Sequence, residues 1–218
     1  MAVNRDDGFL SEAISSILNQ SFEDFEFIIV CNSASDDLWA ALQKYQIDPR
    51  IRLFRTSISQ IPFCLNFALE NSRGELIARM DADDISHKNR FEKQINYFKS
   101  HDLDVLGGFC DVIDDRGVFK MTLKLPISHT DIMNEIVWSC PLVHPSILCR
   151  RDILIKARGY AYTFFAEDYE LWLRLARTTK AKFGNLPEPI ISYREHDSQS
   201  TGKGNSAENL KEVFLTPI

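Results

Sequence analysis

Three aspartates close together in the chain are the residues best suited to carry out chemistry. Asp81, Asp83 and Asp84 directly follow the apolar, alternating segment 75–80, which Gly74 precedes. This pattern predicts a strand that ends in acids. Carboxylates this close repel one another unless a cation lies between them, and Mg²⁺ or Mn²⁺ commonly binds one or two carboxylates together with substrate phosphates. The cluster therefore predicts a metal–phosphate site at the carboxyl end of a strand, where open α/β sheets bind ligands.

A solvated acidic turn is an equally simple interpretation of this cluster, because negative charge is favourable at the start of the helix expected next. A calcium-binding EF-hand loop is excluded. Ile85 and Ser86 stand where that loop needs a ligand and a glycine. The residues alone leave the metal site and the acidic turn both open.

A second group of charged side chains lies later in the chain. Glu167 and Asp168 open an expected helix, whose dipole they would complement. Arg194 and His196 follow an expected strand and are suited to bind a diphosphate. An ion pair with a neighbouring acid explains these two residues equally well.

Three other residues that could belong to a site are expected to be structural. His144 is interpreted as a hydrogen-bonded core histidine, although it could also face an acceptor. Trp138 and Cys140 are expected to pack in the interior.

Helix and strand signals alternate along the chain. The patterns predict helices over 9–19, 36–45, 61–70, 88–100, 129–138 and 167–178, and strands over 25–30, 51–55, 75–80, 104–110 and 145–150. They also predict a hairpin over 111–124 and a short strand pair over 181–194. The alternation indicates an α/β fold with a mainly parallel, doubly wound sheet flanked by helices, and a small mixed region near the C-terminus.

Composition narrows the class of protein. The chain has 218 residues, 44% of them hydrophobic, which suits one globular domain. A net charge of −6 gives no indication of nucleic-acid binding. Five cysteines without CxxC spacing favour a reducing compartment, and no apolar stretch approaches the ~20 residues of a membrane span. A cytoplasmic protein is expected, with peripheral membrane contact as an option.

The chain resembles glycosyltransferase family 2 in several segments that occur in the family's order. These segments are 14–22, 24–30, 79–94, 166–175 and 193–196. The resemblance implies a GT-A, Rossmann-like domain over 1–198, with a nucleotide-sugar-binding half at 1–100, an acceptor-binding half at 101–198 and a polar tail at 199–218. It also implies inverting transfer of a sugar from a nucleotide-diphosphate sugar to a hydroxyl of a glycan or lipid-linked acceptor, in surface polysaccharide or glycolipid synthesis.

The resemblance assigns roles to particular residues. Asp83 matches the family's contact to Mn²⁺ or Mg²⁺, and Asp81 matches the residue nearer the ribose. Asp168 matches the base that deprotonates the acceptor hydroxyl. Arg194 and His196 lie in the stretch that closes over the nucleotide sugar in the family.

Two positions depart from the family's usual pattern. An aromatic residue is usual where this chain has Asn4, and an acid is usual where it has Cys31 and Asn32. Asn4 and Asn32 are the expected substrate-binding residues at these places, since an amide can pair with a base edge. Because of these departures, the sequence does not identify the nucleotide of the donor, and UDP is taken as the default. The departures also suggest one alternative, a nucleotide-sugar-binding module without turnover. A nucleotidyltransferase that uses the same acids on a similar sheet is a second alternative.

The first strand looks short against the same family. Members carry about six residues of that strand before the position of Met1. The expectation is that Met1 is an internal methionine of a longer reading frame.

Overall fold

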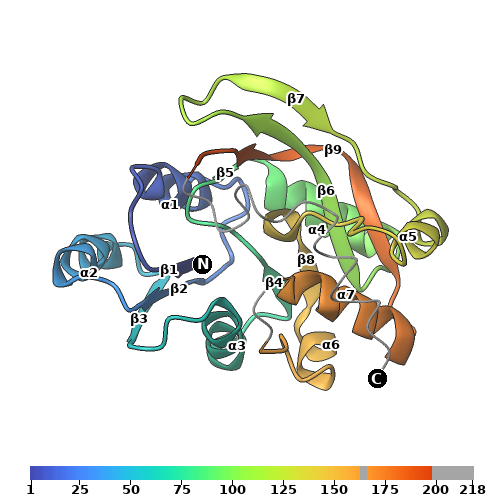
Figure 1. Ribbon diagram of the computed structural model, residues 1–218, viewed down its shortest axis with the longest axis horizontal. Coiled ribbons are helices and arrows are strands. Elements are labelled where there is room, and N and C mark those ends of the chain that lie inside the picture. Colours follow the sequence, from blue (N-terminus) through green and yellow to red (C-terminus); the bar gives the residue numbers. More distant parts are fainter. Residues whose placement is uncertain (163–165, 198–218) are drawn as a thin grey trace.

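A computed structural model describes residues 1–162 and 166–197, so the predicted tail at 199–218 lies outside the described residues. The fold is α/β and contains two sheets with helices packed around them (Figure 1). The helices are α1 (Leu10–Leu18), α2 (Asp36–Gln43), α3 (Ile61–Asn71), α4 (Arg90–Ser100), α5 (His129–Glu135), α6 (Arg151–Lys156) and α7 (Glu167–Thr178), with 3₁₀ turns η1 (Lys44–Ile47) and η2 (His144–Ser146).

The first sheet is parallel and has the order β1–β2–β3. Its strands are β1 (Ala2–Val3), β2 (Phe27–Asn32) and β3 (Ile51–Thr56). Every residue of β2 is buried, and its side chains alternate between two cores. Ile29 packs with the apolar face of α1, whereas Ile28 and Val30 pack with Cys64 of α3. Helices therefore cover both faces, as a parallel sheet requires.

The second sheet is mixed and has the order β4–β8–β6–β9–β5, with β7 paired to β6. Its strands are β4 (Leu76–Ala78), β5 (Ile85–Ser86), β6 (Val105–Ile113), β7 (Phe119–Leu123), β8 (Leu148–Arg150) and β9 (Phe183–Arg194). The central pair β6–β9 is parallel and the other pairs are antiparallel. On one face Val105 packs with α5, α6 and α7, and on the other Leu106 packs with α4.

The predicted α/β class and its six helices are confirmed, with ends that differ by a few residues. The hairpin is also confirmed as β6–β7. The continuous parallel sheet has three strands, because β4 pairs with β8 in the mixed sheet instead of joining β1; the pair β6–β9 is also parallel. The predicted strand pair at 181–194 is wrong: β9 is one strand whose register with β6 shifts between Leu186 and Pro189 and again after Pro189. Bulges there accommodate prolines, which cannot donate to the ladder.

The acidic cluster lies on the connection from β4 to β5, which pair with β8 and β9 respectively. In the strand order these are the two ends of the mixed sheet, so residues 79–84 cross from one edge to the other. Both strands belong by number to the predicted 1–100 half, yet they pair with strands of the 101–198 half. The two predicted halves therefore share one sheet, and the predicted division itself stays untested.

Candidate active site

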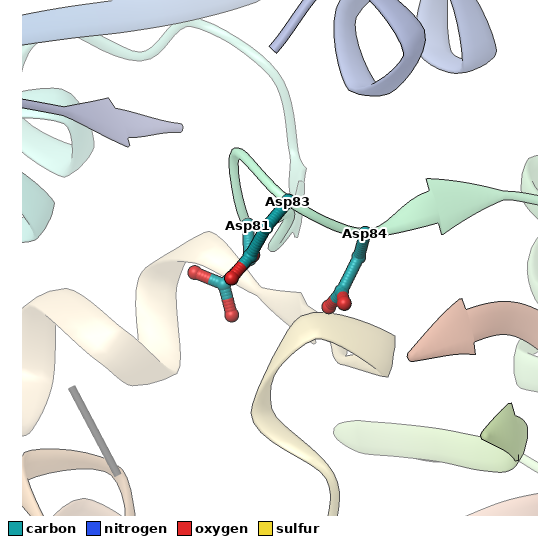
Figure 2. Close-up of side chains that lie close together, drawn as sticks. All are labelled: Asp81, Asp83 and Asp84. Atoms are coloured by element: carbon teal, nitrogen blue, oxygen red, sulfur yellow. The ribbon is translucent and has the colours of Figure 1, made fainter. Parts of the chain in front are cut away.

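The three aspartates of the acidic cluster converge. One oxygen from each of Asp81, Asp83 and Asp84 lies within 4.8 Å of the others, and the carboxylates point to the same side of the connection (Figure 2). Asp84 is 1% exposed, and its Oδ1 accepts a hydrogen bond of 2.8 Å from the backbone N–H of Arg194. Its Oδ2 is buried and has no hydrogen-bond partner among the described residues.

Burial raises the pKa of Asp84 well above its usual range, and the charges of Asp81 and Asp83 raise it further. An orphaned carboxylate oxygen beside two other carboxylates is an unfavourable arrangement without a cation. The all-oxygen donor set suits Mg²⁺ or Mn²⁺. The residues present therefore fit a divalent ion.

His196 lies beside the predicted metal residue. Its Nε2 is 3.0 Å from Oδ2 of Asp83, and its ring lies 5.0 Å from the ring of Phe9 between centroids. Burial and the charge of Asp81 raise the pKa of Asp83, whereas the contact with His196 lowers it. The end of β9 thus reaches the acidic cluster, although 113 residues separate the two in sequence.

One cleft brings together five of the predicted site residues. It is lined by Asn4, Asn32, Asp81, Asp83 and His196, among others. Asn4 follows β1 and Asn32 ends β2, so both stand at the carboxyl edge of the parallel sheet, next to the acidic connection. This is where ligands bind in open α/β sheets. Their roles in binding stay predictions.

Arg194 is buried and is not among the described side chains that line the cleft. Its Nε donates to the backbone oxygen of Asp83 (2.9 Å), and its Nη2 donates to Oε2 of Glu12 (2.6 Å). Its Nη1 donates to the carbonyls of Asp114 and Asp115, in the turn between β6 and β7. These contacts join three parts of the chain, and the predicted contact with a diphosphate stays untested.

Asp168 lies in the first turn of α7, after Ala166, whose φ of +55° is left-handed. Such a conformation is unfavourable for alanine and sharply turns the chain into the helix. Burial raises the pKa of Asp168, while the backbone N–H of Tyr169 and the charge of Arg79 oppose that rise. A carboxylate with a raised pKa is a stronger base than an exposed one, which suits the predicted role.

Arg79 is a cleft residue to which the sequence patterns assigned no role. It forms an ion pair through Nη1 with Oδ2 of Asp81, and it lines the cleft. Burial opposes its charge, but the neighbouring Asp81 outweighs burial and raises its pKa. A signal existed in the sequence: an arginine at the end of an apolar segment, two residues before an acid, can form an ion pair with that acid.

The structural assignments were correct in two cases of three. His144 is buried, and its Nε2 lies 3.0 Å from the hydroxyl oxygen of Tyr160. Cys140 is partly buried against the core, and burial together with the charge of Asp168 raises its pKa to about 12. The prediction for Trp138 is wrong, because its side chain is 86% exposed. The helical turn after α5 buries Ile136 and directs Trp138 outward.

Comparisons with known proteins show the family of the chain. The model of a family described as Glycosyl transferase family 2 matches residues 1–158. The Escherichia coli O-antigen biosynthesis glycosyltransferase WbnJ is 36% identical over 203 residues, which cover 92% of this chain and 80% of WbnJ. The E. coli UDP-Gal:alpha-D-GlcNAc-diphosphoundecaprenol beta-1,3-galactosyltransferase is 28% identical over 212 residues, covering 94% of this chain and 75% of that protein.

Solved structures share the fold. S. aureus TarS in complex with UDP-GlcNAc superimposes with a TM-score of 0.78 at 18% identity, over 97% of this chain and 62% of TarS. The Pyrobaculum calidifontis mannosyltransferase PcManGT, in complex with GDP-Man and Mn²⁺, gives a TM-score of 0.68 at 16% identity, over 88% of this chain and 55% of PcManGT. Among the described residues, none of the helices is long and apolar enough to cross a membrane.

Proposed function

The chain belongs to glycosyltransferase family 2, and we propose that its cleft transfers a sugar from a nucleotide-diphosphate sugar to an acceptor hydroxyl, with inversion. The observation that carries the proposal is the convergence of Asp81, Asp83 and Asp84 beside the carboxyl ends of β1 and β2. The setting proposed is the assembly of surface polysaccharide or of a glycan on a lipid carrier. The relatives named above for O-antigen synthesis and for a diphosphoundecaprenol acceptor support it.

Asp83 would hold a divalent ion, with Asp81 and Asp84 beside it. When bound, that ion neutralises charge on the diphosphate. Asp81 would contact the ribose, and the amides of Asn4 and Asn32 would contact the nucleoside at the edge of the parallel sheet. TarS binds UDP-GlcNAc and PcManGT binds GDP-Man with Mn²⁺, so the neighbours support a nucleotide-sugar donor. UDP remains the default nucleotide.

Asp168 would act as the base. The acceptor oxygen forms a bond to the anomeric carbon as the bond from that carbon to the phosphate oxygen breaks. The electron pair of the broken bond stays on the nucleoside diphosphate, and the acceptor proton passes to Asp168. Burial, which raises the pKa of Asp168, strengthens it as an acceptor of that proton.

Replacement of Asp83 tests the proposed donor site. Wild-type protein is expected to bind UDP in the presence of MnCl₂ and to release it on addition of EDTA, as measured by isothermal titration calorimetry. Asp83→Ala is expected to lose most of this binding and to keep its circular dichroism spectrum, because Asp83 lies in a connection and not in a core. Asp115→Ala, which removes an exposed carboxylate from the β6–β7 turn, is the matched control.

Two outcomes would contradict the proposed function, one for the metal site at Asp83 and one for turnover. Equal nucleotide affinity in Asp83→Ala and in wild type would exclude a metal-bridged diphosphate at Asp83. Tight UDP binding in wild type without donor hydrolysis or transfer would instead favour the module that binds a nucleotide sugar without turnover.

A further inference from the structure

One cationic residue that lines the cleft, Arg79, has no role in the proposed function. Arg79 follows β4 at the point where the connection to β5 begins, and its side chain is 11% exposed. Two backbone hydrogen bonds hold its position: its N–H donates to the carbonyl of Ile147 (2.9 Å), and its carbonyl accepts from Nη2 of Arg90 (2.9 Å). Arg79 therefore lines the cleft from a fixed backbone, with its guanidinium beside Asp81.

The guanidinium of Arg79 has an N–H donor that no acceptor satisfies among the described residues. Nη1 pairs with Asp81, whereas the buried Nε has no hydrogen-bond partner among the described residues. A guanidinium carries five N–H donors in a planar fork, and a buried donor without an acceptor is unfavourable. The unpaired Nε indicates that an oxygen-rich anion completes the site.

The neighbours of Arg79 indicate which kind of anion it binds. Its charge acts on Asp81 and Asp84 of the acidic cluster and on Asp168 at the start of α7. Arg79 also forms an ion pair with Asp81 and lines the same cleft as Asp83. The group expected in this cleft is the diphosphate-linked sugar.

Other arginines near the cleft are less suited to this contact. Arg194 donates to Glu12 and to three backbone carbonyls. Arg5 lines the rim, but its side chain is 54% exposed and pairs with Asp7. Of these three arginines, Arg79 combines burial, a place in the cleft and unfilled donors.

We propose that Arg79 contacts the diphosphate of the donor and stabilises the negative charge that develops on the departing nucleoside diphosphate. This inference rests on the proposed function. A bidentate guanidinium suits phosphate oxygens, and a cation fixed before the reaction lowers the energy of a charged leaving group without reorganisation. In this role the ion pair with Asp81 orients the guanidinium fork toward the donor.

The test compares a nucleoside diphosphate with its monophosphate, because the monophosphate lacks one of the two phosphates that Arg79 is proposed to contact. Calorimetric affinities with MnCl₂ are measured for UDP and UMP, or for GDP and GMP if the wild type binds GDP instead. Arg79→Gln removes the charge at similar size, and Arg79→Lys keeps the charge without the fork. Arg116→Gln removes an exposed charge from the β6–β7 turn, outside the cleft.

Arg79→Gln is expected to reduce the preference for diphosphate over monophosphate by about 10- to 100-fold, the usual effect of losing charge-assisted hydrogen bonds. Its affinity for the monophosphate should stay within about 2-fold of wild type. Arg79→Lys should recover part of the preference, and Arg116→Gln should keep all of it.

An unchanged preference in Arg79→Gln overturns the inference, and so does an equal loss of affinity for both ligands. If Arg79→Gln does not fold, Arg79→Lys decides the matter: an unchanged preference in that variant overturns the inference. Failure of the wild type to bind either diphosphate overturns the proposed function and the inference together, which distinguishes the two kinds of failure.

Discussion

Single carboxylates carry most of the proposed chemistry, and burial perturbs several of them in the same direction. Burial is the main reason that the pKa values of Asp83, Asp84 and Asp168 are raised. An acid whose pKa is raised in the folded state favours a proton or a cation there. The acidic cluster and the proposed base are therefore both arranged to receive positive charge, from a metal ion in one case and from the acceptor proton in the other.

Asp168→Asn separates chemistry from binding. The amide keeps the size of the side chain but cannot accept the acceptor proton, so transfer is expected to slow by roughly 10²- to 10⁴-fold. Affinity for the nucleotide should stay within a few-fold of wild type. Rates from product analysis and affinities from calorimetry measure the two effects. Wild-type transfer in Asp168→Asn, or loss of its fold, would show that this acid only complements the dipole of α7.

The pH profile of the wild-type protein tests the same residue. A base acts in its deprotonated form, and burial raises the pKa of Asp168 above the usual value for aspartate. Transfer should therefore fall as pH is lowered through a midpoint above about 4. A rate that stays constant down to pH ~4 would contradict a perturbed base at this position.

At the scale of elements, the exposure of an aromatic side chain decides how much it contributes to the stability of the fold. Trp172, on α7, is fully buried in the core of the mixed sheet, whereas Trp138, just after α5, is 86% exposed. The two residues have the same chemistry and lie on neighbouring elements of one region. They form a matched pair for measuring how much this core contributes to stability.

Trp172→Ala is expected to lower the free energy of unfolding by about 3–5 kcal/mol, since it leaves a cavity. For a chain of this length the melting temperature should fall by roughly 6–20 °C. Trp138→Ala should shift it by at most about 2 °C, because an exposed side chain adds little packing. Differential scanning fluorimetry compares the two variants. A large loss of stability in Trp138→Ala would mean that this side chain is buried after all.

At the scale of the whole molecule, Arg194 joins distant parts of the chain. It contacts Glu12 of α1, the backbone of Asp83 and the β6–β7 turn, which lie 182, 111 and 80 residues away in sequence. Its backbone N–H also donates to Asp84. Contacts of this range connect the parallel sheet, the acidic connection and the mixed sheet around one side chain.

Arg194→Met should lower the melting temperature of the ligand-free protein and also weaken nucleotide binding with MnCl₂. The reason is that the acidic connection loses its anchor while the apolar part of the side chain is kept. Thermal melts in EDTA and calorimetry with UDP measure the two effects separately. Weaker binding with an unchanged melting temperature would instead support the direct contact to the diphosphate that the sequence resemblance implies.

The sequence by itself determined the family, the α/β class and most of the helices and strands. These follow from patterns that a short stretch of chain carries alone, such as the apolar run 27–31 in β2 or the acids directly after β4. A strand that ends in acids has the same local pattern wherever it is placed, so the acidic cluster could be recognised before its surroundings were known.

Only the tertiary structure decided what surrounds each side chain. It brought His196 to Asp83, bound Arg194 to the backbone of Asp83, placed Arg79 beside Asp81 and exposed Trp138. It also made residues 183–194 one strand, because pairing with β6 accommodates the prolines in bulges. The physical reason is that these outcomes depend on contacts between elements far apart in sequence, and the hydrophobic period of one element carries no information about its partner.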